Sequence, residues 1–289
     1  MCLAHVEQQS CPAAAFEVGV VDGTGTGAAA DVVERFSAGA PVRIRYEGAR
    51  QPGKCAAWNH GLRAARGQRV LFLSTDVLAS PRLIERHMDM HRVNAMPLCA
   101  PGAIAPHPQL PAGAITPWFL PEDQCITLES EFDLLDCSAA HLSLPRKEAL
   151  DAGGFAAGFP PGEFCDAELA WRLSRRRVLV KPAAGALVYA WRPSLFDSEC
   201  VRQYQRGYAL HQFVACTGQG HLAKRFHLGR RIYQYYFLKP IIPVYIEVCR
   251  QSQENNASMG TIYRRVLRYY FAKGYLDARR GRPAQAPVR

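Results

Sequence analysis

The 289-residue chain is long enough for one large α/β domain, or for one domain with a smaller appendage. Apolar residues make up 48% of it without forming a membrane-span-like run, which argues against a disordered chain and against an integral membrane protein. The formal net charge of +10 lies largely in the C-terminal part, and the ten singly scattered cysteines indicate neither a zinc site nor a disulfide framework. Because no signal-peptide pattern is recognised, we expect a reduced, cytoplasmic setting.

Short β-branched strands alternate with helices in the first 75 residues. In chain order the patterns predict a strand at 16–22, a helix at 28–36, a strand at 42–46, a helix at 53–67 and a strand at 70–73. This alternation is typical of a parallel sheet wound with helices. Ligands bind such sheets at the carboxyl ends of strands, which makes Asp22 and Asp76 candidate ligand contacts. Each aspartate could instead cap the turn or helix that follows it.

The middle of the chain combines a proline-rich segment with a second candidate carboxylate. Seven prolines between residues 97 and 124 predict a loop or lid rather than a long helix or strand. Residues 162–173 predict a loop running into a helix, and Asp166 lies near the start of that helix, where the macrodipole favours an ionised carboxylate. Glu168 and Arg172 are spaced for an i,i+4 salt bridge, so we expect Asp166 to face a pocket and that pair to be structural.

The C-terminal part is basic, rich in tyrosine and predicted to be helical at 201–213 and 221–237. The apolar stretch 235–249 is too short and too interrupted by proline to cross a bilayer, but it could lie in an interface. The helix-like segment 261–273 carries apolar residues on one side and arginines on another, a pattern suited to an anionic membrane surface. It could instead be a helix packed on the preceding α/β domain with its arginines in water. We do not expect a nucleic-acid partner, because no known nucleic-acid-binding module is recognisable in the sequence.

Five short motifs follow one another in an order and spacing that resemble the family 2 glycosyltransferases of the GT-A fold. The motifs are Val-Val-Asp ending at Asp22, Trp-Asn-His at 58–60, Leu-Ser-Thr-Asp ending at Asp76, Gly-Gly-Phe at 153–155 and Asp-Ala-Glu-Leu beginning at Asp166. The resemblance covers about residues 3–195. It implies a GT-A, Rossmann-like α/β domain over 1–195, with a mostly parallel sheet flanked by helices, followed by a helical C-terminal appendage over 196–289.

The resemblance also implies an activity: an inverting glycosyltransferase that moves a sugar from a nucleotide-sugar donor to a hydroxyl of a glycan or lipid-linked acceptor. By this resemblance Asp22 would contact the nucleoside, and Lys54 and Asn59 would lie near the donor, although Lys54 could simply be an exposed cation. Asp76 would help to hold Mg²⁺ or Mn²⁺ on the donor diphosphate, and Asp166 would be the general base. The chemistry agrees, since a diphosphate leaving group needs a cation and the acceptor hydroxyl needs a proton acceptor.

Several positions depart from the family pattern. Gly23 stands where a second aspartate is usual, Ser74 replaces the first aspartate of the metal motif, Cys165 replaces a glutamate, and no histidine occurs at 187–192. The chain also begins in a segment that resembles the family's first helix, so we expect the first strand to be missing or to be encoded upstream of Met1. One carboxylate is a poor cage for Mg²⁺ or Mn²⁺. A catalytically degenerate GT-A-like binding or scaffold protein is therefore the alternative to an enzyme.

Overall fold

The computed structural model describes residues 1–49, 51–110, 132–160, 163–191, 195–254 and 260–284. The chain divides into two compact units: unit 1 comprises residues 1–105 and 124–191, and unit 2 comprises residues 106–123 and 192–289. The domain boundary expected between residues 195 and 196 stays a prediction.

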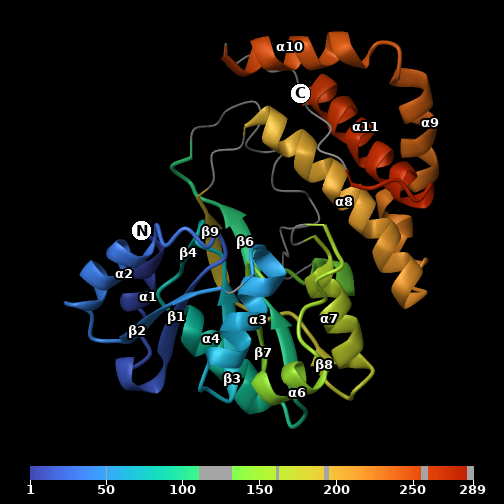
Figure 1. The fold of residues 1–289 in the computed structure, drawn as a ribbon. Coiled ribbons are helices and arrows are strands. Elements are labelled where there is room, and N and C mark those ends of the chain that lie inside the picture. Colours follow the sequence, from blue (N-terminus) through green and yellow to red (C-terminus); the bar gives the residue numbers. More distant parts are fainter. Residues whose placement is uncertain (50, 111–131, 161–162, 192–194, 255–259, 285–289) are drawn as a thin grey trace. The chain divides into compact units, whose positions relative to one another are not determined.

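The first part of unit 1 follows the predicted alternation of strands and helices (Figure 1). Its elements are α1 (Cys2–Glu7), η1 (Ala13–Ala15), β1 (Glu17–Asp22), α2 (Ala30–Ser37), β2 (Arg43–Gly48), α3 (Lys54–Ala64) and β3 (Arg69–Leu73). Strands β1 and β2 pair in parallel, with Asp22 opposite Gly48, and α3 packs on β1. Helix α3 ends before the expected stop at Gly67, because Ala65 already has an extended ψ of 142°.

The second part of unit 1 contains strands that pair in both directions. Its elements are β4 (Val77–Ala79), α4 (Leu83–Val93), β5 (Leu98–Pro101), β6 (Ala103–Pro106), η2 (Leu134–Asp136), β7 (His141–Pro145), α6 (Arg146–Asp151), α7 (Cys165–Ser174), β8 (Leu179–Val180) and β9 (Leu187–Ala190). Strand β7 runs antiparallel to both β3 and β5, and β9 runs antiparallel to β4, while β5 and β8 are parallel.

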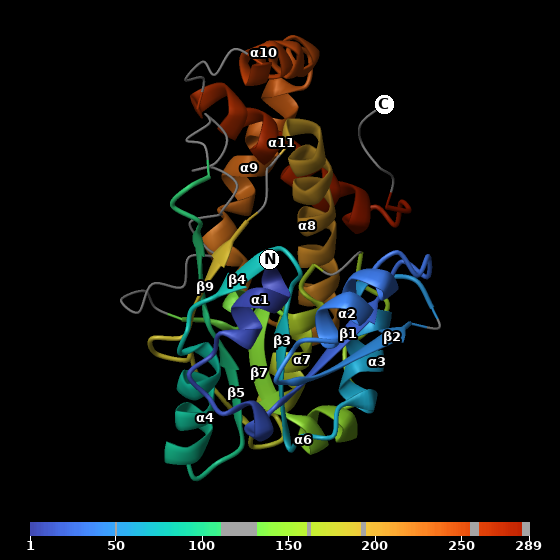
Figure 2. The same cartoon turned by 90° about the vertical axis from the view of Figure 1, so that its left-hand side faces the viewer.

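The expected α/β fold is confirmed, but the sheets are mixed rather than mostly parallel. Figure 2 shows β3, β7 and β5 side by side, and helices α3, α4, α6 and α7 pack against strands β1, β5, β7 and β8 respectively. A helical crossover makes successive strands parallel, as between β1 and β2. Among the later strands, β7 lies between β3 and β5 and runs antiparallel to both, so this part of the sheet does not follow the expectation.

The prediction of a loop over residues 97–124 is wrong for the first ten of these residues. Strands β5 and β6 occupy Leu98–Pro101 and Ala103–Pro106, and each ends at a proline. Proline is compatible with a strand where its missing N–H leaves no ladder bond unmade, such as at a strand end. Residues 107–110 form a turn, and the remainder of the expected loop, residues 111–124, lies outside the described residues.

Unit 1 buries a chain of polar side chains between α4 and β7. Ser143 Oγ lies between two imidazoles, 2.9 Å from His91 Nε2 and 2.8 Å from His87 Nδ1. The other nitrogen of His87, Nε2, lies 2.8 Å from His141 Nε2. Nδ1 of His141 lies 3.0 Å from the carbonyl oxygen of Ala103. Because that carbonyl only accepts, neutral His141 donates from Nδ1 and accepts at Nε2 from His87, and Ser143 then donates to His87 and accepts from His91. All three imidazoles are satisfied in their neutral form.

Unit 2 is helical in its described part. Its elements are α8 (Phe196–Thr217), η3 (Leu222–Phe226), α9 (Leu228–Leu238), α10 (Ile242–Glu254) and α11 (Gly260–Arg279). Helices α8 and α11 lie alongside each other and touch through glycines (Figure 1). A Cβ added at Gly207 would overlap the carbonyl oxygen of Phe271, and one added at Gly274 would overlap that of Tyr204. The contact of the two helices therefore depends on these two glycines.

The amphipathic helix expected at 261–273 exists as part of α11, but its apolar side is buried inside unit 2. Val266, Tyr269 and Tyr270 are all under 8% exposed, and the Tyr269 ring stacks on Tyr235 of α9 with their centroids 4.8 Å apart. This apolar face is covered by protein and does not face a membrane. Within the described part of the chain, no helix has the length and apolar character needed to cross a bilayer.

Candidate functional site

Asp22 ends strand β1, and its carboxylate is held by neighbouring donors. Oδ1 accepts from the backbone N–H of Thr24 at 2.8 Å and from its hydroxyl at 2.6 Å, and Oδ2 accepts from the Tyr46 hydroxyl at 3.0 Å. The hydrogen bonds from Thr24 lower the pKa of Asp22, which keeps the carboxylate ionised. Tyr46, on the paired strand β2, is a contact that the sequence reading missed.

The loop after Asp22 packs on the start of α3, where Lys54 is the first helical residue. The backbone N–H of Gly53 donates to the carbonyl of Gly23 at 3.1 Å, and a Cβ at Gly23 would lie 3.1 Å from the Cβ of Ala57. The Lys54 side chain is exposed. These contacts bring the end of β1 and the N-terminus of α3 together, and the donor-binding roles of Asp22 and Lys54 stay predictions.

Asp76 lies in the turn between β3 and β4 and is partly exposed. Its carbonyl accepts from the backbone N–H of Trp191 at 2.7 Å, and the next residue, Val77, pairs with Ala190 of β9. The segment that lacks the family's histidine therefore lies directly beside Asp76. Cys2 also lies here, since its thiol is 3.8 Å from the carbonyl oxygen of Ser74.

Asp166 is the second residue of α7 and is buried, with 5% of its surface exposed. Its Oδ2 accepts from the backbone N–H of Ala139 at 2.9 Å, and Oδ1 accepts from the N–H of Ala167 at 3.0 Å. Burial raises the pKa of Asp166 to about 6, against the opposing effect of these two hydrogen bonds. Desolvation thus outweighs the N–H donors and the helix dipole in setting this pKa, but a pKa of about 6 still leaves the carboxylate largely ionised at pH 7.

The turns that carry Asp76 and Asp166 are joined through residues 139 and 140. The backbone N–H of Ser74 donates to the carbonyl of Ala140 at 3.1 Å, while the N–H of Ala139 donates to Asp166. This segment precedes β7, whose antiparallel pairing with β3 places it at the carboxyl end of β3. Asp76 and Asp166 are therefore brought to the same edge of the sheet.

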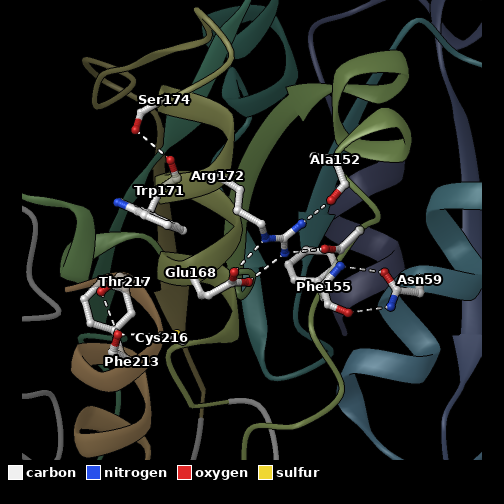
Figure 3. A network of polar contacts seen from close by, with 11 residues as sticks. Asn59, Ala152, Phe155, Glu168, Trp171, Arg172, Ser174, Phe213, Cys216 and Thr217 are labelled. Carbon is white, nitrogen blue, oxygen red and sulfur yellow. Dashed lines mark hydrogen bonds and ion pairs between the residues drawn. The ribbon is translucent and has the colours of Figure 1, made fainter. Parts of the chain in front are cut away.

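Asn59 and Arg172 hold the Gly-Gly-Phe turn from two sides (Figure 3). The Asn59 amide donates to the carbonyl of Phe155 and accepts from its N–H, both at 2.7 Å. The Arg172 guanidinium donates to the carbonyls of Ala152 and Gly154 and forms the expected salt bridge with Glu168, at 2.6 Å. The structural role predicted for the Glu168 and Arg172 pair is thus confirmed, and both polar groups of the Asn59 amide are used in positioning this turn.

A pocket of about 270 Å³ opens beside α3. It is lined by Gln51, Ala56, Asn59, His60, Arg63 and Ala157. Asp22, Asp76 and Asp166 do not line it, so this pocket cannot be assigned to a donor held by those three residues.

The described side chains do not form a cage for a metal ion. Among them, no group of three or more His, Cys, Asp or Glu side chains is arranged to hold one. From the described residues a cation at Asp76 would meet one carboxylate, whereas Mg²⁺ and Mn²⁺ require about six ligands, chiefly oxygens. The described protein ligands alone do not fit such an ion.

The comparison with protein families gives a match in the N-terminal part of the chain. Residues 1–102 match the model of glycosyl transferase family 2. This match includes the positions of Asp22, Lys54, Asn59 and Asp76, and it confirms the resemblance for that part of the chain. A search of curated protein sequences gave no significant match.

Solved structures of glycosyltransferases share the fold along nearly the whole chain. The mannosyltransferase PcManGT from Pyrobaculum calidifontis, in complex with GDP-Man and Mn²⁺, is 14% identical with a TM-score of 0.65, covering 98% of this chain and 83% of that one. TarS 1–349 from S. aureus, in complex with UDP-GlcNAc, is 13% identical with a TM-score of 0.51, covering 97% of this chain and 87% of that one. At these identities the likeness establishes the GT-A fold. Together with the family match it supports a glycosyltransferase enzyme.

Proposed function

We propose that the protein is an inverting glycosyltransferase that transfers a sugar from a nucleotide-sugar donor to a hydroxyl of its acceptor, with Asp166 as general base. The observation that carries this proposal is the buried Asp166 carboxylate, which lies at the same edge of the sheet as Asp76 and has a pKa of about 6. A carboxylate with this pKa is largely ionised at pH 7 and is a stronger base than an ordinary aspartate. It is suited to take the proton of an attacking hydroxyl.

The donor site of the proposal lies at the ends of β1 and β3. Asp22 would contact the nucleoside, Lys54 the donor phosphates, and Asn59 would act from the side of the donor through the Gly-Gly-Phe turn that it holds. A Mg²⁺ or Mn²⁺ ion would meet Asp76 as its protein ligand, and diphosphate oxygens and water would have to supply the remaining ligands. No step of the proposal depends on that ion.

Replacing the base tests the chemistry separately from binding. Asp166→Asn should lower the transfer rate at least about 100-fold, because a positioned base contributes roughly 10² to 10⁴. In the original protein kcat/KM should rise with pH through about 6, as Asp166 ionises, and the product should have the anomeric configuration opposite to that of the donor. Asp151→Asn, which changes an exposed aspartate paired with Lys147, is the matched control and should keep full activity.

Donor binding is measured in the same experiment by thermal stabilisation with UDP-, GDP- and dTDP-sugars, with and without Mn²⁺. Asp166→Asn should retain the stabilisation seen with the productive donor. Full transfer activity in this variant would refute the role of Asp166.

One observation favours a second function, that of a catalytically degenerate GT-A-like binding or scaffold protein. Both carboxylate oxygens of Asp166 already accept backbone N–H groups and the side chain is only 5% exposed, an arrangement that also serves to fix the start of α7. The absence of thermal stabilisation by every nucleotide sugar in the panel would favour this alternative.

We further propose that the acceptor is a glycan or a lipid-linked glycan and that the protein works in the cytoplasm, in peripheral contact with an anionic membrane. The support for the contact is the charge of the C-terminal part: residues 192–289 contain 17 Lys and Arg and 5 Asp and Glu. The buried apolar face of α11 does not supply such a contact, so another surface must.

A further inference from the structure

Helices α9 and α10 leave a row of large apolar side chains in solvent. Tyr233 is 72% exposed, Phe237 69% and Val244 62%, and Tyr236 and Ile241 are exposed between them. Figure 1 shows α9 and α10 meeting at an angle, and these residues lie on either side of that junction. We call this set of five residues the aromatic corner.

The aromatic corner is the outer face of helices whose inner face is firmly packed. Tyr235, Leu238 and Ile242, which alternate with the exposed residues, are 5–8% exposed and belong to the core of unit 2. The exposed rings therefore do not result from helices that lack a core contact. Large apolar side chains gathered in solvent on neighbouring segments in this way mark a site of interaction.

Cations surround the aromatic corner. Arg280 donates to the Tyr236 hydroxyl at 2.9 Å, and Arg265 donates to the hydroxyl of Tyr245, the next residue after Val244, at 3.3 Å. Exposed Arg230 and Lys239 flank Tyr233 and Phe237 along α9. Between residues 228 and 250 the sequence has four Lys and Arg and one acid, Glu247.

We propose that the aromatic corner docks the protein on the headgroup region of an anionic lipid bilayer. Tyrosine combines an apolar ring with a polar tip and is favoured at membrane interfaces, while lysine and arginine reach the lipid phosphates. A second copy of this chain would bring the same cationic surface against itself, which disfavours self-association. Ile241 and Val244 have no π-face for bases, which disfavours a nucleic acid. The inference rests on the proposed membrane contact but not on the transfer reaction.

Vesicle flotation tests the proposal. The full chain should float with vesicles containing about 30% anionic phosphatidylglycerol and remain unbound with pure phosphatidylcholine, and binding should weaken as salt rises. The double variant Phe237→Asp and Val244→Asp should lose binding at least tenfold. Because both side chains are more than 60% exposed, the helical circular dichroism should not change. Val93→Asp, which changes a 73% exposed valine in unit 1, is the matched control and should bind as the original protein does.

The remaining outcomes overturn the proposal. Equal binding to neutral and anionic vesicles, or unchanged binding of the double variant, would show that the charge or the surface is wrongly assigned. A dimer in light scattering that the double variant abolishes, without vesicle binding, would make the aromatic corner a contact between copies. Retention by single-stranded RNA in place of vesicles would make it a nucleic-acid surface. Asp166→Asn should float like the original protein, so failure of docking and failure of the proposed reaction are measured independently.

Discussion

Acidification from pH 7.5 to 5.5 should destabilise unit 1, because His87, His91 and His141 are buried in their neutral form. Burial lowers the pKa of His91 and of His141 to about 4, and the positive charge of Arg69 adds to the effect at His91. Burial, followed by the neighbouring imidazoles, holds the pKa of His87 well below its ordinary value. In the unfolded chain each imidazole returns to about 6.5.

The sign and size of the effect follow from proton linkage. Each imidazole takes up its proton on unfolding, so the stability it contributes is complete above pH 6.5 and is lost as the pH falls toward 4. At pH 5.5 the loss is about 1.4 kcal/mol for each imidazole, or about 4 kcal/mol for the three. Asp166 acts in the opposite direction, because its pKa of about 6 in the folded state lies above the usual 3.8 and returns about 1 kcal/mol at pH 5.5. The expected net loss of about 3 kcal/mol is a large part of ordinary protein stability.

Urea unfolding at pH 7.5, 6.5 and 5.5, followed by tryptophan fluorescence, measures this loss. Trp58, Trp171 and Trp191 lie in unit 1. His91→Gln should reduce the pH-dependent loss by about 1.4 kcal/mol, nearly half of the net value, since its amide can still donate to Ser143 but does not titrate. His221→Gln, at an exposed position in unit 2, should leave the loss unchanged. A loss below about 1 kcal/mol in the original protein would refute neutral burial of the three imidazoles.

Two further substitutions test how the units are packed. Gly274→Ala should destabilise unit 2 by about 1–3 kcal/mol or more, measured by hydrogen exchange of α8 and α11 amides, because its Cβ would overlap the Tyr204 carbonyl. Gly229→Ala, in α9 with open space around its Cβ, should not destabilise, and equal effects at the two sites would contradict the close contact of α8 and α11. Asn59→Ala should cost about 2–3 kcal/mol in unfolding free energy, because the N–H and carbonyl of Phe155 both lose their partner. Asn94→Ala removes one hydrogen bond at the end of α4 and should cost less than about 1 kcal/mol. A larger loss of unfolding free energy for Asn94→Ala than for Asn59→Ala would contradict the two hydrogen bonds between Asn59 and Phe155.

The sequence predicts best where local pattern and tertiary structure agree. The strands and helices predicted in the first 75 residues are found within a few residues of their predicted bounds, because short strand-forming runs alternate there with helix-forming segments. The pairing of Glu168 with Arg172 depends only on helical spacing and is also confirmed. The spacing of His87 with His91 on a helix, and of His141 with Ser143 on a strand, was a readable signal for the buried chain. The sequence could not show that these two elements face each other.

The failures have a common physical origin, which is that burial depends on the whole fold. The apolar side of the segment 261–273 indicates an interacting face in the sequence, but whether lipid or protein covers it depends on α8 and α9. The surface left in solvent is instead on α9 and α10, where buried Tyr235 is followed directly by exposed Tyr236 and Phe237. Hydrophobicity alone does not distinguish these neighbours, because only the position of α11 decides which ring is covered.

Burial by distant segments also explains why the pKa of Asp166 is higher than its place at a helix start implies. A helix start favours the charged carboxylate by about 0.3–1 kcal/mol, a benefit that can be anticipated from position in the sequence. Removing the carboxylate from water penalises the charged form, and its pKa of about 6 indicates that this penalty exceeds the help from Ala139 and Ala167 by about 3 kcal/mol. The contact with Ala139 comes from the turn before β7, 27 residues away in the chain. Asp166 thus becomes a stronger base than its local sequence implies because distant segments enclose it, and this enclosure also limits the access of an acceptor to its oxygens.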